Sequence, residues 1–151
     1  MKDKGKGMTL IVKTITRYTV WLIALYGIYI ILHGHLTPGG GFAGGVIIAL
    51  ALLNIMLAYG REFTRKWLRI NLLHELEATS AIIFLIIGIL GVAISGSFLA
   101  NFLHHGKLFN LVSAGTIPIL NIVIGIKVCV GLFVVVWSLA LFHIPKKGGT
   151  E

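Results

Sequence analysis

Four long apolar runs occupy most of this 151-residue chain and restrict its fold more than any other feature. They cover residues 18–32, 41–59, 78–99 and 117–142, and the first extends back to Leu10 if Lys13 and Arg17 turn their charged ends toward water. A helix needs about 20 apolar residues to cross a bilayer. With 57% hydrophobic residues, a soluble fold would leave large apolar patches in water. The sequence therefore predicts an all-α integral membrane protein with four transmembrane helices, forming a single membrane domain over residues 1–151.

The net charge of +8 is distributed unevenly between the connections. Basic residues gather before the first run, between the second and third runs, and after the fourth: Lys2, Lys4, Lys6, Lys13, Arg17, Arg61, Arg65, Lys66, Arg69, Lys146 and Lys147. The other two connections carry only Lys107. Cytoplasmic loops of membrane proteins are enriched in lysine and arginine. The pattern predicts that both termini are cytoplasmic in a multi-pass protein of the plasma membrane, and it leaves no support for nucleic-acid binding.

A glycine-rich segment, HGHLTPGGGFAGG, joins the first two runs over residues 33–45. A glycine inside a helix costs about 1 kcal/mol relative to alanine, but it permits unusual backbone angles and close approach of another helix. We expect Pro38 to mark the start of regular helix and residues 39–41 to be unwound, either for packing or to present backbone groups to an ion. The segment also holds two overlapping GxxxG pairs, Gly40 with Gly44 and Gly41 with Gly45. They predict close packing of the second helix against an adjoining subunit.

Lys127 is the only formal charge inside the four runs as drawn above. It follows Ile117 by ten residues, which is about 15 Å along a helix and places it near the bilayer midplane. A charge at that depth costs about 2.5–3.5 kcal/mol, so it is a candidate functional residue. Two roles fit Lys127: it lines or gates an ion path, or it pairs with a carboxylate on a neighbouring subunit.

The surroundings of Lys127 favour a subunit over a self-sufficient transporter. Glu75 and Glu77 are expected at the cytoplasmic edge of the third helix, roughly 15–20 Å from Lys127. Asn54, deep in the second run, is the candidate neutral partner in the ion path, but it cannot neutralise a charge. Because an unpaired ammonium is not viable in hydrocarbon, we expect its counter-charge on another polypeptide, or water in its place.

The remaining segments predict little chemistry. Residues 61–77 have apolar residues at helical spacing, typical either of an amphipathic helix in the membrane interface or of a simple charged anchor. Residues 101–116 have room for a short surface helix. The histidine pairs at 33/35 and 104/105 lack acidic or cysteine companions, so no metal site or cofactor is expected. No catalytic residues are evident, because no serine lies near an acid–base pair.

Two segments, HGHLTPGGGFAGGVI and NIVIGIKVCVGL, together resemble the B subunit of Mrp-type multisubunit Na+/H+ antiporters, the MnhB family. Members of this family also occur in archaeal membrane-bound hydrogenases and related sulfur-reducing complexes. The resemblance extends over residues 18–142. It carries the family motif onto Pro38, Gly39, Gly40, Gly41, Phe42, Gly44, Gly45, Gly125 and Lys127. Ala43 departs from the pattern, since many relatives have a larger polar residue there, often glutamine.

The resemblance implies a non-catalytic subunit of an ion-translocating complex, either an Mrp antiporter or a redox-driven complex of hydrogenase or sulfur-reductase type. Its partners would be other small antiporter-type subunits, large proton-channel subunits and membrane lipid, with any redox centres in other chains. Two alternatives remain: a structural scaffold with no part in the ion path, and a small independent transporter. Replacing Lys127 by methionine separates the scaffold from the ion-path role.

Overall fold

The computed structural model describes residues 8–103 and 114–142, and its described elements are all helices. Four of them are long and apolar enough to cross a membrane: α1 (Leu10–His33), α2 (Gly40–Tyr59), α4 (Ile70–Ser95) and α5 (Ile117–Phe142). A short helix, α3 (Arg61–Trp67), lies between α2 and α4. The prediction of an all-α protein with four spanning helices is confirmed.

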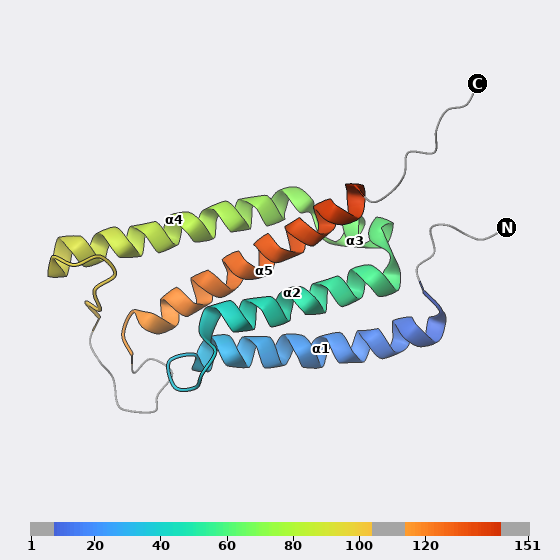
Figure 1. The fold of residues 1–151 in the computed structure, drawn as a ribbon, viewed down its shortest axis with the longest axis horizontal. Helices are drawn as coiled ribbons and strands as arrows, with labels where there is room; N and C mark the ends of the chain where they lie inside the picture. The colour runs from blue at the N-terminus through green and yellow to red at the C-terminus, as the bar shows by residue number, and fades with distance from the viewer. Residues whose placement is uncertain (1–7, 104–113, 143–151) are drawn as a thin grey trace, which may run out of the picture.

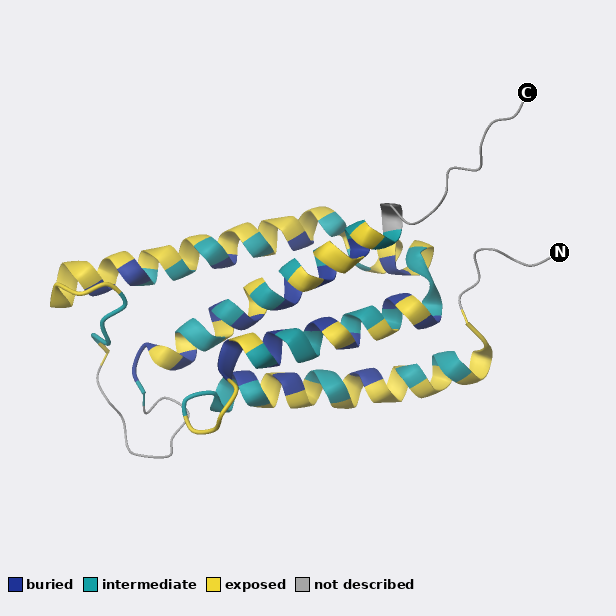
Figure 2. Cartoon of the chain, viewed as in Figure 1, coloured by how far each residue is buried: buried dark blue, intermediate teal, exposed yellow. Residues whose placement is uncertain are grey.

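The long helices lie side by side, with α2 between α1 and α5, and α4 packed mainly on α5 (Figure 1). A small core gathers near the end of the bundle at which α3 lies, around Phe133 and Trp137 of α5. Apolar side chains such as Trp21 and Leu139 remain exposed, at 72% and 63%, and exposed residues cover the outer faces of the helices (Figure 2). Such surfaces are typical of helices that face lipid or neighbouring subunits.

The first helix begins at Leu10, the longer of the two starts that the sequence allows, so it includes Lys13, whose ammonium lies 5.9 Å from the centre of the Tyr59 ring. The third spanning helix covers Ile70–Ser95, and the predicted range of 78–99 is wrong at both ends. It ends early because Gly96 adopts a left-handed conformation, with φ of +74°, which terminates the helix. At about 1.5 Å per residue, α4 is about 39 Å long and reaches beyond the hydrocarbon core.

Of the two interpretations of residues 61–77, a continuous amphipathic helix in the interface is contradicted by the structure. Leu68 and Arg69 are extended, and they separate α3 from α4. The break lets Leu68 pack against the core cluster, which also includes Leu73 on the first turn of α4. Residues 70–77 are therefore part of a spanning helix. The surface helix expected within residues 101–116 falls largely on 104–113, outside the described residues.

The start of α1 and the end of α5 lie at the same end of the bundle as α3 (Figure 1). The charge pattern predicts that this end is cytoplasmic. Cysteines introduced at Leu36 and Lys66, which are exposed at opposite ends, test this orientation with a membrane-impermeant maleimide. We expect L36C to react in intact cells and K66C only after permeabilisation. Cys129 is buried and serves as the unreactive control, while the reverse labelling pattern would contradict the proposed orientation.

Candidate functional site

The glycine-rich segment ends in an unwound entrance to α2. Gly39 and Gly40 have φ of +140° and +81°, conformations that side-chain-bearing residues rarely adopt. α2 begins at Gly40, two residues after Pro38, so Gly40 and Gly41 already belong to the helix. Of the unwound stretch expected over residues 39–41, only Gly39 lies outside the helix, and Gly40 enters it with a positive φ.

The glycines of α2 contact other helices of the same chain. A Cβ atom at Gly45 would lie 2.6 Å from the carbonyl oxygen of Gly125, and one at Gly41 would collide with the backbone of Asn121, both on α5. One at Gly44 would meet the carbonyl of Gly27, on α1, at 2.7 Å. The expectation that these glycines pack against an adjoining subunit is therefore wrong. These glycines make contacts within the chain, because α2 lies between α1 and α5 and approaches the backbone of both.

Asn121 is a polar residue at this entrance that the sequence did not single out. Its side-chain nitrogen is buried, and within the described part of the chain no group forms a hydrogen bond with it. The amide lies against Gly34 and Gly40, at positions where a Cβ atom would touch it. The sequence contains one signal for this residue, because Asn121 is a polar residue four positions before Gly125 in a largely apolar run.

Asn54 and Lys127 are not brought together. Asn54 is exposed on α2, and it is not among the residues that line the cavity next to Lys127, which is described below. A role for Asn54 as the neutral partner of Lys127 finds no support in this arrangement.

Lys127 lines a cavity of about 490 Å³ together with Glu77. The wall residues come from α4, α5 and the start of α2: Glu77, Ala81, Phe84, Ile124, Lys127, Val128, Gly131, Leu132 and Phe42. Lys127 and Phe42 are both exposed, so the cavity opens to the outside of the chain. The two opposite charges therefore share one depression between the neighbouring helices α4 and α5 (Figure 1).

Glu77 belongs to a spanning helix because α4 begins earlier than the sequence predicts, and the packing of α4 on α5 places it in the Lys127 cavity. Seven residues separate it from the start of α4, so it lies about 10 Å inside that helix. A carboxylate oxygen of Glu77 is 3.6 Å from the position of a Cβ atom at Gly131. Gly131 is one helical turn from Lys127. The expectation that both glutamates remain at the membrane edge, remote from Lys127, is wrong for Glu77.

In this cavity the Glu77 carboxylate can accept a proton or a hydrogen bond, and the Lys127 ammonium can donate one. The walls around them are largely apolar. Electrostatic interactions are stronger there than in water, and a charge without compensation is expensive. A cation or a proton that reaches Glu77 changes the field at Lys127, and the reverse also holds. Within residues 8–103 and 114–142, no three histidine, cysteine or acidic side chains gather where they could hold a metal ion.

Comparisons with known proteins agree with the resemblance to MnhB that the glycine-rich segment and the Lys127 segment indicate. Residues 11–134 match the family model described as a domain related to the MnhB subunit of Na+/H+ antiporter. An uncharacterized protein of Methanocaldococcus jannaschii is 40% identical over 76% of this chain and 45% of its own length. A Na+/H+ antiporter subunit of Bacillus subtilis is 35% identical over 48% of this chain and 50% of its own. The chain thus spans about half the length of these relatives.

A solved structure supports the same assignment. A chain in the membrane-bound sulfane sulfur reductase, an archaeal respiratory membrane complex, is 35% identical and superposes with a TM-score of 0.72. The match covers 92% of this chain and 63% of that one. Together with the family match over most of the sequence, it places this multi-pass membrane protein in the MnhB family of antiporter subunits.

Proposed function

We propose that this chain is a non-catalytic membrane subunit of the Na+/H+ antiport module of a multisubunit complex in the plasma membrane. The observation that carries the proposal is the open cavity that holds Lys127 and Glu77. An exposed lysine inside a spanning helix is costly against lipid, by about 2.5–3.5 kcal/mol. The cavity is therefore covered by a neighbouring subunit or filled with water, and each case fits a component of an ion path.

The pair acts as an electrostatic gate. In this scheme the Glu77 carboxylate and the Lys127 ammonium attract each other across the cavity that both line. A sodium ion or a proton at the Glu77 carboxylate weakens this attraction, and Lys127 then repels the next cation. The chain transfers no covalent group in this scheme, since the two side chains only attract, release and repel charge.

The relatives suggest two settings for such a module. The Bacillus subtilis relative is named as a subunit of a Na+/H+ antiporter, and the structural relative belongs to a respiratory sulfur-reducing complex. We propose partners of the same kinds: small antiporter-type subunits and large proton-channel subunits, with redox subunits in the second setting. Any redox cofactor would lie in those other chains.

Co-purification in mild detergent tests this proposal. A tagged copy of the chain, extracted from its native membrane, is expected to bring down antiporter-type subunits that mass spectrometry identifies, and untagged membranes provide the control. Additional hydrogenase-like or sulfur-reductase-like subunits would indicate a redox-driven pump, and their absence an Mrp-type exchanger. Recovery of the chain alone would contradict the subunit role and favour a small independent transporter.

A further inference from the structure

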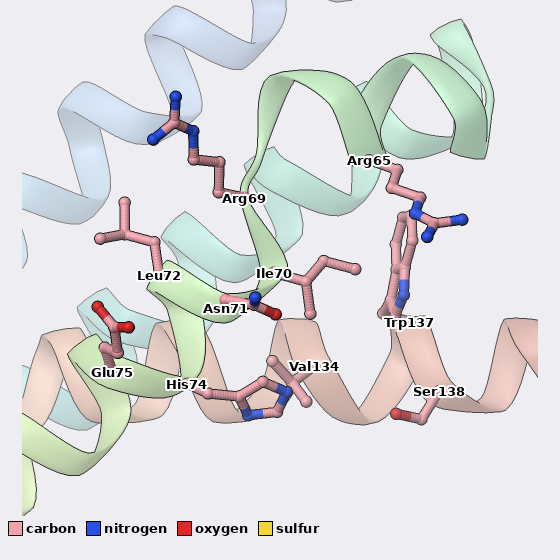
Figure 3. A pocket seen from close by; sticks show the side chains of 10 residues that line it. All are labelled: Arg65, Arg69, Ile70, Asn71, Leu72, His74, Glu75, Val134, Trp137 and Ser138. Carbon is pink, nitrogen blue, oxygen red and sulfur yellow. The ribbon is translucent and has the colours of Figure 1, made fainter.

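A second cavity, of about 830 Å³, lies at the end of the bundle near α3, away from Lys127. It is formed where α3, the start of α4 and the last turns of α5 meet (Figure 3). Its wall contains Arg65, Arg69, Ile70, Asn71, Leu72, His74, Glu75, Val134, Trp137 and Ser138. The proposed ion path uses none of these residues.

The wall combines two arginines with further hydrogen-bond donors. Figure 3 shows Arg65 beside the Trp137 ring and Arg69 on the other side of the extended link, with Asn71 between them. Glu75 is the one acidic residue of the wall. Guanidinium groups bind phosphate through paired hydrogen bonds and keep their charge at any physiological pH. The side chains therefore favour an anion that carries phosphate.

The backbone at the start of α4 adds to this preference. The first intrahelical bond of α4 runs from the Leu73 amide to the Arg69 carbonyl, at 3.2 Å. The amides of Ile70, Asn71 and Leu72 precede that bond, and all three residues line the cavity. Amides at a helix start point outward and carry the positive end of the helix dipole.

The position of the cavity along the spanning helices indicates where the anion comes from. The candidate membrane span of α4 begins at Ile70 and that of α5 ends at Ala140, so the cavity lies near the ends of both spans, at the level of the membrane interface. Trp137 provides the amphipathic ring that is common at that level. Leu72 is half exposed and Val134 adds an apolar wall, which suits the glycerol and upper acyl part of a lipid.

We propose that this cavity binds the headgroup of an anionic phospholipid, with its phosphate between Arg65 and the start of α4, and with Arg69, whose guanidinium points away from Arg65, as a further positive charge at the rim. Basic pockets between transmembrane helices on the cytoplasmic side bind such headgroups in other membrane proteins. An acidic segment of a partner subunit is the competing occupant. The apolar wall and the depth of the cavity favour the lipid, because a soluble acidic segment would leave that wall without a partner. The proposal does not depend on ion translocation.

Native mass spectrometry of the full chain in a neutral detergent tests the proposal, with phosphatidylglycerol and phosphatidylcholine as probes. We expect a one-to-one adduct with the anionic lipid and little with the zwitterionic one. R65Q is expected to weaken the adduct about fivefold, and R65Q/R69Q about 25-fold, because each arginine near an anionic headgroup contributes a factor of about five. The matched control K66Q removes a neighbouring charge of α3 that does not line the cavity, and its adduct is expected to be unchanged.

Four results would overturn the proposal. Equal adducts with both lipids would remove the charge preference, and equal losses in K66Q and R65Q would indicate diffuse surface charge. Displacement of the lipid by millimolar inorganic phosphate would indicate a soluble anion. In the complex from native membranes, a photo-crosslinker at position 138 is expected to label lipid, and labelling of an acidic protein segment would show the competing occupant. The charge-conserving R65K/R69K variant is expected to keep the preference, which checks that the effect in R65Q/R69Q comes from charge.

Discussion

Replacing Gly45 by alanine is expected to separate α2 from α5 and to destabilise the protein by about 1–3 kcal/mol, despite the better helix propensity of alanine. The added Cβ atom would lie 2.6 Å from the Gly125 carbonyl oxygen and 3.0 Å from the Cβ atom of Val128. The first obstacle is backbone, so it cannot rotate away, and the two helices must move apart. Thermal unfolding in detergent, followed by circular dichroism, measures the loss.

Gly131 on α5 provides the matched control. A Cβ atom there would meet only a carboxylate oxygen of Glu77, at 3.6 Å, which is an ordinary contact. G131A is therefore expected to leave stability unchanged or to raise it by up to about 1 kcal/mol, the difference in helix propensity between alanine and glycine. If G45A were as stable as G131A, the close approach of α2 and α5 described above would be wrong.

Replacing Lys127 by methionine is expected to abolish Na+/H+ exchange by the assembled complex. Methionine keeps much of the volume and removes the charge, so the carboxylate of Glu77 would remain in the cavity without compensation. The cavity would then lose the positive charge that the proposed gate requires opposite Glu77. Exchange is measured as sodium-driven dissipation of a pH gradient in inverted membrane vesicles, with the amount of assembled complex determined in the same membranes.

Further variants separate an ion-path role from structural pairing. The neutral double variant E77Q/K127M is expected to assemble better than K127M but to remain inactive. The exposed Asn54 is the control position, and N54L is expected to retain exchange, because this side chain does not line the Lys127 cavity. Full exchange by K127M in a complex assembled at normal levels would instead establish the scaffold role.

Much of the fold is predictable from the sequence because hydropathy alone identifies spanning helices. The four runs, the start of α2 after Pro38 and the location of the start of α1 and the end of α5 at one end of the bundle all follow from local pattern. The start of α4 does not, because His74, Glu75 and Glu77 interrupt the apolar run that the prediction relies on. Only the packing of Leu73 into the core shows that these polar residues belong to the spanning helix.

The presence of Lys127 and Glu77 in one cavity could not be derived from the sequence for a related reason. Fifty positions separate the two residues, and nothing local indicates that α4 lies against α5. For the same reason, the sequence does not show which helices the glycines of α2 contact. A GxxxG pair predicts a close approach, but it does not indicate which helix approaches, and here both partners belong to the same chain.

The unequal packing of the four helices has a mechanical consequence. Glycines bring α2 to backbone distance of both α1 and α5, whereas α4 contacts mainly the single neighbour α5. Any displacement of α4 relative to α5 therefore changes the separation of the Glu77 carboxylate and the Lys127 ammonium, and with it the electrostatic potential in the cavity.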